Sequence, residues 1–205
     1  MQRYQLLTQN EIEQIHENSL RIMENVGIIF TYEPAKEILK KAGAKVDGDL
    51  IRFPREMVER ELKNVPSSFT MYARNPKKNV EITCEKTAYV GPYGSPFVTD
   101  MDKGRRSGTL DDFINIVKIC DKLDNIDIQS HISCEPNDVD VKIRAQVMVY
   151  NTLKYSDKPL MGSVYGYEKS KQCIEMASML FGGMDAIKDK PVMASIPCTL
   201  TPLSY

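Results

Sequence analysis

The sequence predicts an α/β protein in which a small α+β region precedes strands and helices in alternation. Two observations lead to this fold class. Over residues 1–85, helical patterns surround one hairpin signal, whereas over residues 86–205 strand and helix patterns alternate strictly. Alternation of this kind is typical of parallel strands joined by crossover helices. The residues alone leave two architectures open, an open sheet and part of a (β/α)8 barrel.

Three helices and one hairpin are predicted in the first region, each from a signal at its ends. A capping pair or a proline marks where a helix begins, and glycine marks helix ends and the hairpin turn. In chain order the signals are Thr8 with Glu11, Gly27, Pro34, Gly43, Asp47 with Gly48, and Pro54. We therefore predict a small α+β extension.

The second region begins with a helix that Thr109 and Asp112 cap, and three strands follow with helices between them. In chain order the predicted elements are a helix at 109–123, a strand at 126–136, a helix at 139–155, a strand at 160–166, a helix at 168–182 and a strand at 192–204. A complete barrel has eight strands, so we expect the chain to be part of a longer one. The unpaired strand edge would otherwise be covered by another copy, and we expect a homo-oligomer.

Composition excludes several classes of protein. The 27 Lys and Arg residues against 28 Asp and Glu give a net charge of -1, which does not favour nucleic acid as a partner. The five cysteines are widely spaced without a zinc pattern, so reduced thiols are expected. We find neither a signal peptide nor a run long enough to span a membrane, and we expect a cytoplasmic protein. Phosphate-binding glycine motifs are also missing from the sequence.

The strand at 126–136 carries the candidate catalytic residues. Strand alternation places Ile128, Ser130, Ile132 and Cys134 on one face, and it places Gln129, His131, Ser133 and Glu135 on the other. A polar face is unusual in a parallel strand, and ligands bind at the carboxyl end of such strands. Glu135 is at that end. His131 could equally be a satisfied core histidine, and Glu135 could cap a helix that opens near Asp138. As a metal-binding pair they lack a third ligand, so no metal site is predicted.

Tyrosines follow the same end of the predicted sheet. Tyr165 stands at the end of the second strand, and Tyr93 lies in the segment "VGPYGSPFVTD", residues 90–100. That segment is rich in glycine and proline, which predicts a shaped loop, either a plain turn or the wall of a site. Tyrosine faces attract ammonium groups, although tyrosines are also common as rim residues. Arg105 and Arg106 before the helix at 109–123 could form an anion site or a solvated turn.

Several stretches of the chain resemble the trimethylamine:corrinoid methyltransferase family, which includes members without pyrrolysine that demethylate glycine betaine. The resemblance covers nearly the whole chain and is carried by "IHENSLRIMENVGI", "AGAKVDGDLIRFP", "GPYGSPFVTDMDKGRRSGTLDDF", "CEPNDV" and "PCTLTPLS". It implies the amino-terminal part of a (β/α)8 TIM barrel, over residues 86–205. It also implies methyl transfer from a methylated amine to the Co(I) state of a corrinoid that a partner protein carries, with no cofactor bound by this chain itself.

In that reaction we expect Glu135 and His131 to be catalytic, and Tyr93, Ser95 and Tyr165 to bind the substrate. Glu135 would balance the positive charge of the amine or transfer a proton, the tyrosines would form the walls of a cage, and His131 would support them. The alternative is a non-catalytic module that docks the corrinoid protein or another chain.

Overall fold

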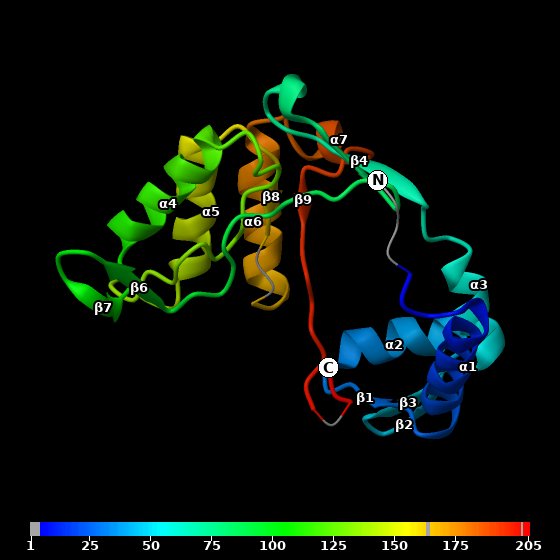
Figure 1. Cartoon of the computed structure of the whole chain (residues 1–205). Coiled ribbons are helices and arrows are strands. Elements are labelled where there is room, and N and C mark those ends of the chain that lie inside the picture. The colour runs from blue at the N-terminus through cyan, green and yellow to red at the C-terminus, as the bar shows by residue number, and fades with distance from the viewer. Residues whose placement is uncertain (1–4, 163–164, 202) are drawn as a thin grey trace. The chain divides into compact units, whose positions relative to one another are not determined.

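The computed structural model describes residues 5–162, 165–201 and 203–205, and it is a mixed α/β structure (Figure 1). The chain forms two units, one of the residues up to Pro66 together with those from Cys198 onwards, and one of Ser67–Pro197. The predicted α/β class is confirmed, whereas the barrel and the domain boundary after residue 85 stay predictions. No helix in the described ranges is long and apolar enough to cross a membrane.

The first unit contains helices around a small antiparallel sheet. Its strands are ordered β1-β3-β2, and Ile51 of β3 pairs with Ile28 on one side and Val46 on the other. Ile51 is fully buried and packs with Phe53 and Met57. The elements are α1 (Gln9–Asn25), β1 (Ile28–Ile29), α2 (Glu33–Ala42), β2 (Lys45–Asp47), β3 (Leu50–Arg52) and α3 (Arg55–Leu62).

The signals predicted at the ends of these elements are confirmed. Thr8 and Glu11 form a capping box, and Gly43 ends α2 in the left-handed conformation with φ 111°. For α1 the helical spacing of the residues predicted an apolar face made of Ile12, Ile15, Ser19, Ile22, Met23 and Val26. The buried residue is instead Leu20, and Ile12 and Ile15 are exposed. The periodicity therefore predicted the helix correctly but not the residue that it buries.

The second unit contains two hairpins and the alternating part of the chain. Helices α4, α5 and α6, which were predicted between the strands, lie side by side (Figure 1). The elements are β4 (Ser68–Met71), the short helix η1 (Pro76–Lys78), β5 (Val80–Thr83), β6 (Phe97–Asp100), β7 (Gly104–Ser107), α4 (Leu110–Lys122), α5 (Arg144–Tyr155), β8 (Leu160–Met161), α6 (Tyr167–Met179), α7 (Met184–Ile187) and β9 (Met193–Ala194).

Parallel pairing between the alternating segments is confirmed, but the paired stretches are much shorter than the predicted strands. Leu160 of β8 pairs with Met193 of β9, and it also forms a parallel bridge with Gln129. On the other side, Ile128 forms a parallel bridge with Val90. The segment around Val90 is thus a fourth member of the parallel set, which the sequence pattern did not predict.

The parallel segments lie between the helices and the β4–β5 hairpin. Leu160 packs against α5 and α6 residues, whereas its neighbour Met161 packs with Met71 of β4 and with Ile128. Adjacent residues therefore face opposite layers, as in any strand. This arrangement leaves the carboxyl ends of the segments to form a single edge, where the candidate catalytic residues lie.

The predicted alternation along 126–136 is wrong beyond Gln129. Ile128 packs with the hairpin layer, whereas Ile132, predicted on the same face, packs with Phe113 and Met148 of α4 and α5. The hydroxyls of Ser130 and Ser133, predicted on opposite faces, lie 2.9 Å apart. The physical reason is that the chain bends at His131 and again after Ile132, so the extended geometry that alternation requires ends at the bridge of Gln129.

Candidate active site

The glycine- and proline-rich segment lies beside the chain that carries Glu135. Gly91 N–H donates to Ile128 O at 3.1 Å, Gly94 N–H to Ile132 O at 2.8 Å, and the N–H of Glu135 to the Ser95 carbonyl at 2.8 Å. Prolines at 92 and 96 have no N–H to donate, so the pairing is interrupted rather than continuous. The segment is therefore not a plain turn, because it runs alongside residues 128–135, and its role as the wall of a site stays a prediction.

Glu135 forms an ion pair with Arg144, the first residue of α5. Arg144 Nη1 donates to Glu135 Oε1 at 2.8 Å, and Arg144 Nε and Nη2 donate to the carbonyl of Val139 at 3.1 and 2.9 Å. The Arg144 side chain is 14% exposed and that of Glu135 is 31% exposed. The capping alternative for Glu135 is wrong, because α5 begins at Arg144 without a side-chain cap and Asp138 instead accepts from Leu110 N–H.

His131 is buried, but it is not a satisfied core residue. It is 1% exposed, and neither ring nitrogen has a hydrogen-bond partner among the described residues. Burial lowers the pKa of His131 to about 4, so the ring is neutral at pH 7. Its centroid lies 6.0 Å from that of the Tyr165 ring. Two unpartnered nitrogens on a fully buried imidazole are uncommon in native proteins and need an explanation.

Tyr165 links His131 to the other predicted residues. Burial raises the pKa of its phenol, and the charges of Glu135 and Tyr93 raise that pKa further. These three groups are therefore close enough to interact electrostatically. Tyr93 and Tyr165 are each 44% exposed, as expected of side chains at the rim of a site. Ser95 is half-buried and joins the group through its carbonyl.

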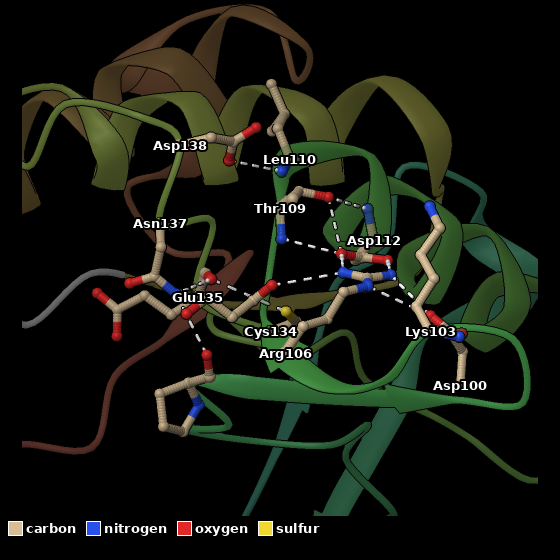
Figure 2. A network of polar contacts seen from close by, with 12 residues as sticks. Asp100, Lys103, Arg106, Thr109, Leu110, Asp112, Cys134, Glu135, Asn137 and Asp138 are labelled. Atoms are coloured by element: carbon tan, nitrogen blue, oxygen red, sulfur yellow. Dashed lines mark hydrogen bonds and ion pairs between the residues drawn. The ribbon is translucent and has the colours of Figure 1, made fainter.

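A network of polar contacts lies next to Glu135 (Figure 2). Arg106 of β7 lies between Asp100 and Asp112, and it donates to Asp112 at 2.5 and 2.8 Å and to Asp100 at 3.0 and 3.2 Å. Asp112 also accepts from the N–H and hydroxyl of Thr109 and so forms the predicted capping box of α4. The anion-site alternative for Arg106 is not supported, because two carboxylates already engage its guanidinium.

The same network fixes the backbone on either side of Glu135. Asn137 Nδ2 donates to the carbonyls of Pro96 and Glu135, and Asn137 N–H donates to Gly108 O. A Cβ at Gly108 would lie 2.0 Å from Cys134 Sγ and 2.8 Å from Glu135 O, so only glycine fits there. The β6–β7 hairpin, the start of α4 and the Glu135 loop are thus held as one piece.

The family model described as trimethylamine methyltransferase (MTTB) matches residues 1–205. The chain belongs to the trimethylamine methyltransferase family. This confirms the resemblance noted from the sequence.

Relatives in this family act on several methylated amines, according to their names. The chain is 41% identical to a glycine betaine methyltransferase of Desulfitobacterium hafniense (strain Y51), over 99% of the chain and 42% of that protein. It is 31% identical to a proline betaine:corrinoid methyltransferase of Eubacterium limosum, over 95% of the chain and 41% of the relative. Against the trimethylamine methyltransferase MttB of D. hafniense (strain DSM 10664 / DCB-2) the identity is 26%, over 94% and 39%. The chain thus spans about two fifths of these family members.

Two basic residues of the site were not found by sequence reasoning. Arg144 reaches Glu135 across nine positions of the chain, and Lys169 of α6 places its Nζ 5.9 Å from the centroid of the Tyr165 ring. No motif connects residues at these separations. Within the described ranges, no cluster of three or more His, Cys, Asp or Glu could hold a metal ion.

Proposed function

We propose that the protein carrying this chain transfers a methyl group from a quaternary amine to the Co(I) corrinoid of a separate carrier protein. The observation that carries the proposal is the gathering of Tyr93, Ser95, His131, Glu135 and Tyr165 at the carboxyl ends of parallel segments. The two betaine methyltransferases above, at 41% and 31% identity, support an amine of the betaine kind.

The chemistry favours a quaternary over a tertiary amine for this set of residues. In a quaternary amine the N–CH3 bond breaks with its electron pair retained by nitrogen, so a neutral amine leaves. A tertiary amine is protonated at neutral pH, and its nitrogen needs further electrophilic activation. The corrinoid supplies the nucleophilic Co(I) to which the methyl carbon bonds, and cobalt is formally oxidised to Co(III). The protein has to orient the amine and exclude water.

We assign roles to the site residues within this reaction. Tyr93 and Tyr165 present ring faces to the ammonium group, and Glu135 balances its positive charge. His131, neutral at pH 7 and buried, supports the cage from behind through its contact with the Tyr165 ring. The Ser95 carbonyl accepts from the Glu135 N–H and so fixes the Glu135 backbone. We assign the Ser95 hydroxyl to substrate binding.

We also propose that the second unit is the amino-terminal part of a (β/α)8 barrel. Its four parallel segments, joined through α4, α5 and α6, support this architecture. The chain covers about two fifths of its relatives. The part of the full-length protein that corresponds to the rest of those relatives would supply the remaining strands.

The test is the exchange of Glu135 for glutamine in the full-length protein. The initial rate of corrinoid methylation is measured with glycine betaine, and Glu81→Gln, an exposed carboxylate of β5, is the matched control. We expect Glu135→Gln to reduce kcat/KM about tenfold or more, because the remaining Arg144 charge repels the ammonium group. An unchanged kcat/KM would mean that Glu135 does not act on the substrate.

A further inference from the structure

Arg144 is fixed at the candidate site by its own loop. Two of its nitrogens hold the Val139 carbonyl and a third holds Glu135, all within 3.1 Å. A guanidinium has five N–H groups, so these three bonds leave about two donors over. Because the side chain is only 14% exposed, its charge is poorly screened by water. The remaining donors are thus held in place for an acceptor.

The charged groups at this site do not sum to a negative charge. Glu135 contributes one negative charge, and Arg144 offsets it at 2.8 Å. His131 is neutral at pH 7, and Lys169 adds a positive charge 5.9 Å from the Tyr165 ring. The Arg144 charge also reaches Tyr165, where it opposes the rise in the phenol pKa. A site with this pattern has a dipole but no net negative charge, so it does not favour a simple cation strongly.

We propose that Arg144 determines specificity by binding the carboxylate of a zwitterionic substrate, while Glu135 and the tyrosines bind its ammonium group. A zwitterion matches both members of the pair, since its carboxylate accepts the spare guanidinium donors and its ammonium group faces Glu135. A cation of the same head group gains only one of these contacts. This inference rests on the proposed function and assigns its preference for betaines to one residue.

The test compares two ligands that share a trimethylammonium group. Glycine betaine carries a carboxylate where choline carries a hydroxymethyl group. Their Kd values are measured calorimetrically with the full-length protein, as wild type and as Arg144→Gln. Lys142→Gln, which removes an exposed positive charge two residues earlier, is the matched control. Arg144→Lys keeps the charge and provides a second variant if the glutamine variant does not fold.

We expect wild type and Lys142→Gln to bind betaine more tightly than choline. Arg144→Gln should shift the ratio of the two Kd values towards choline by about tenfold or more, through weaker betaine and tighter choline binding. Arg144→Lys should keep the preference for betaine. An unchanged ratio of the two Kd values in Arg144→Gln would overturn the role of the Arg144 charge, and so would a loss of the preference for betaine in Arg144→Lys. In either case, betaine binding by the wild type would still uphold the proposed function. If the wild type binds neither ligand, the proposed function fails and this inference fails with it.

Discussion

Arg106 should hold the start of α4 in place, and its replacement by methionine tests this. The side chain of Arg106 is 28% exposed, and those of Asp112 and Asp100 are 16% and 35% exposed. Hydrogen bonds to charged groups stabilise by about 1.5–3 kcal/mol when buried, whereas exposed ion pairs contribute about 0.2–1 kcal/mol. We assign about 1.5 kcal/mol to the bidentate Asp112 pair and about 0.5 kcal/mol to Asp100. The expected loss is therefore about 2 kcal/mol.

Amide hydrogen exchange of the full-length protein provides the assay, read from peptides that cover residues 104–117. A loss of about 2 kcal/mol in local stability corresponds to exchange about 30-fold faster. The Arg106 guanidinium holds the pKa of Asp112 well below its usual range, so the pair is fully ionised at the neutral pH of the measurement. Arg105→Met is the matched control, because Arg105 is exposed and its guanidinium carbon lies 4.0 Å from the centroid of the Phe97 ring. Its loss should change exchange by about twofold. Equal exchange in the two variants would refute the proposed role of Arg106.

Three further predictions concern single residues of the second unit. Gly108→Ala should destabilise the protein by about 1–3 kcal/mol, because the added Cβ would lie 2.0 Å from Cys134 Sγ. Adding Cys134→Ala should recover part of the loss in Tm, and a double variant with the same Tm as Gly108→Ala would show that this contact is not the cause. Lys158→Met should lower the free energy of unfolding in urea by about 2–4 kcal/mol, because Lys158 Nζ donates to three backbone carbonyls at 2.6–2.7 Å. The control Lys122→Met, at an exposed lysine, should lower it by under about 0.5 kcal/mol, and similar losses in the two variants would contradict the role of Lys158. The pKa of His131 is about 4 in the folded protein and about 6.5 in the unfolded chain. As pH falls from 6.5 to 4, the free energy of unfolding of the wild type should therefore drop by up to about 3 kcal/mol relative to that of His131→Leu. Parallel curves of stability against pH for the two proteins would show that His131 is not buried as described.

Local signals predicted the helices of this chain well. The capping box of Thr109 and Asp112 and the left-handed Gly43 depend only on residues within one turn of a helix end, so a single sequence contains them. The face of α1 that is buried depends on what packs against it, and there the pattern did not identify Leu20.

The strands and the site could be predicted only in part. Alternation assumes an extended chain, and the bend at His131 reversed the faces of the residues after it. The candidate residues were predicted to lie together because the carboxyl ends of parallel segments meet at one edge, and their roles on a substrate stay predictions. Arg144 was missed because it reaches Glu135 through the fold. The ion pair between Arg144 and Glu135 makes the candidate site dipolar, whereas Glu135 alone would make it anionic.

The most direct measurement of the central claim is methyl transfer by the full-length protein. A corrinoid carrier reduced to Co(I) is mixed with the protein and glycine betaine, and cobalt absorbance is followed together with the amine product. The account predicts methylated corrinoid and N,N-dimethylglycine in equal amounts. The contradicting result is that neither product forms with glycine betaine, trimethylamine, dimethylamine or carnitine. The protein must be folded, and the carrier must accept methyl groups from another donor. That result would contradict methyl transfer and favour a non-catalytic docking module.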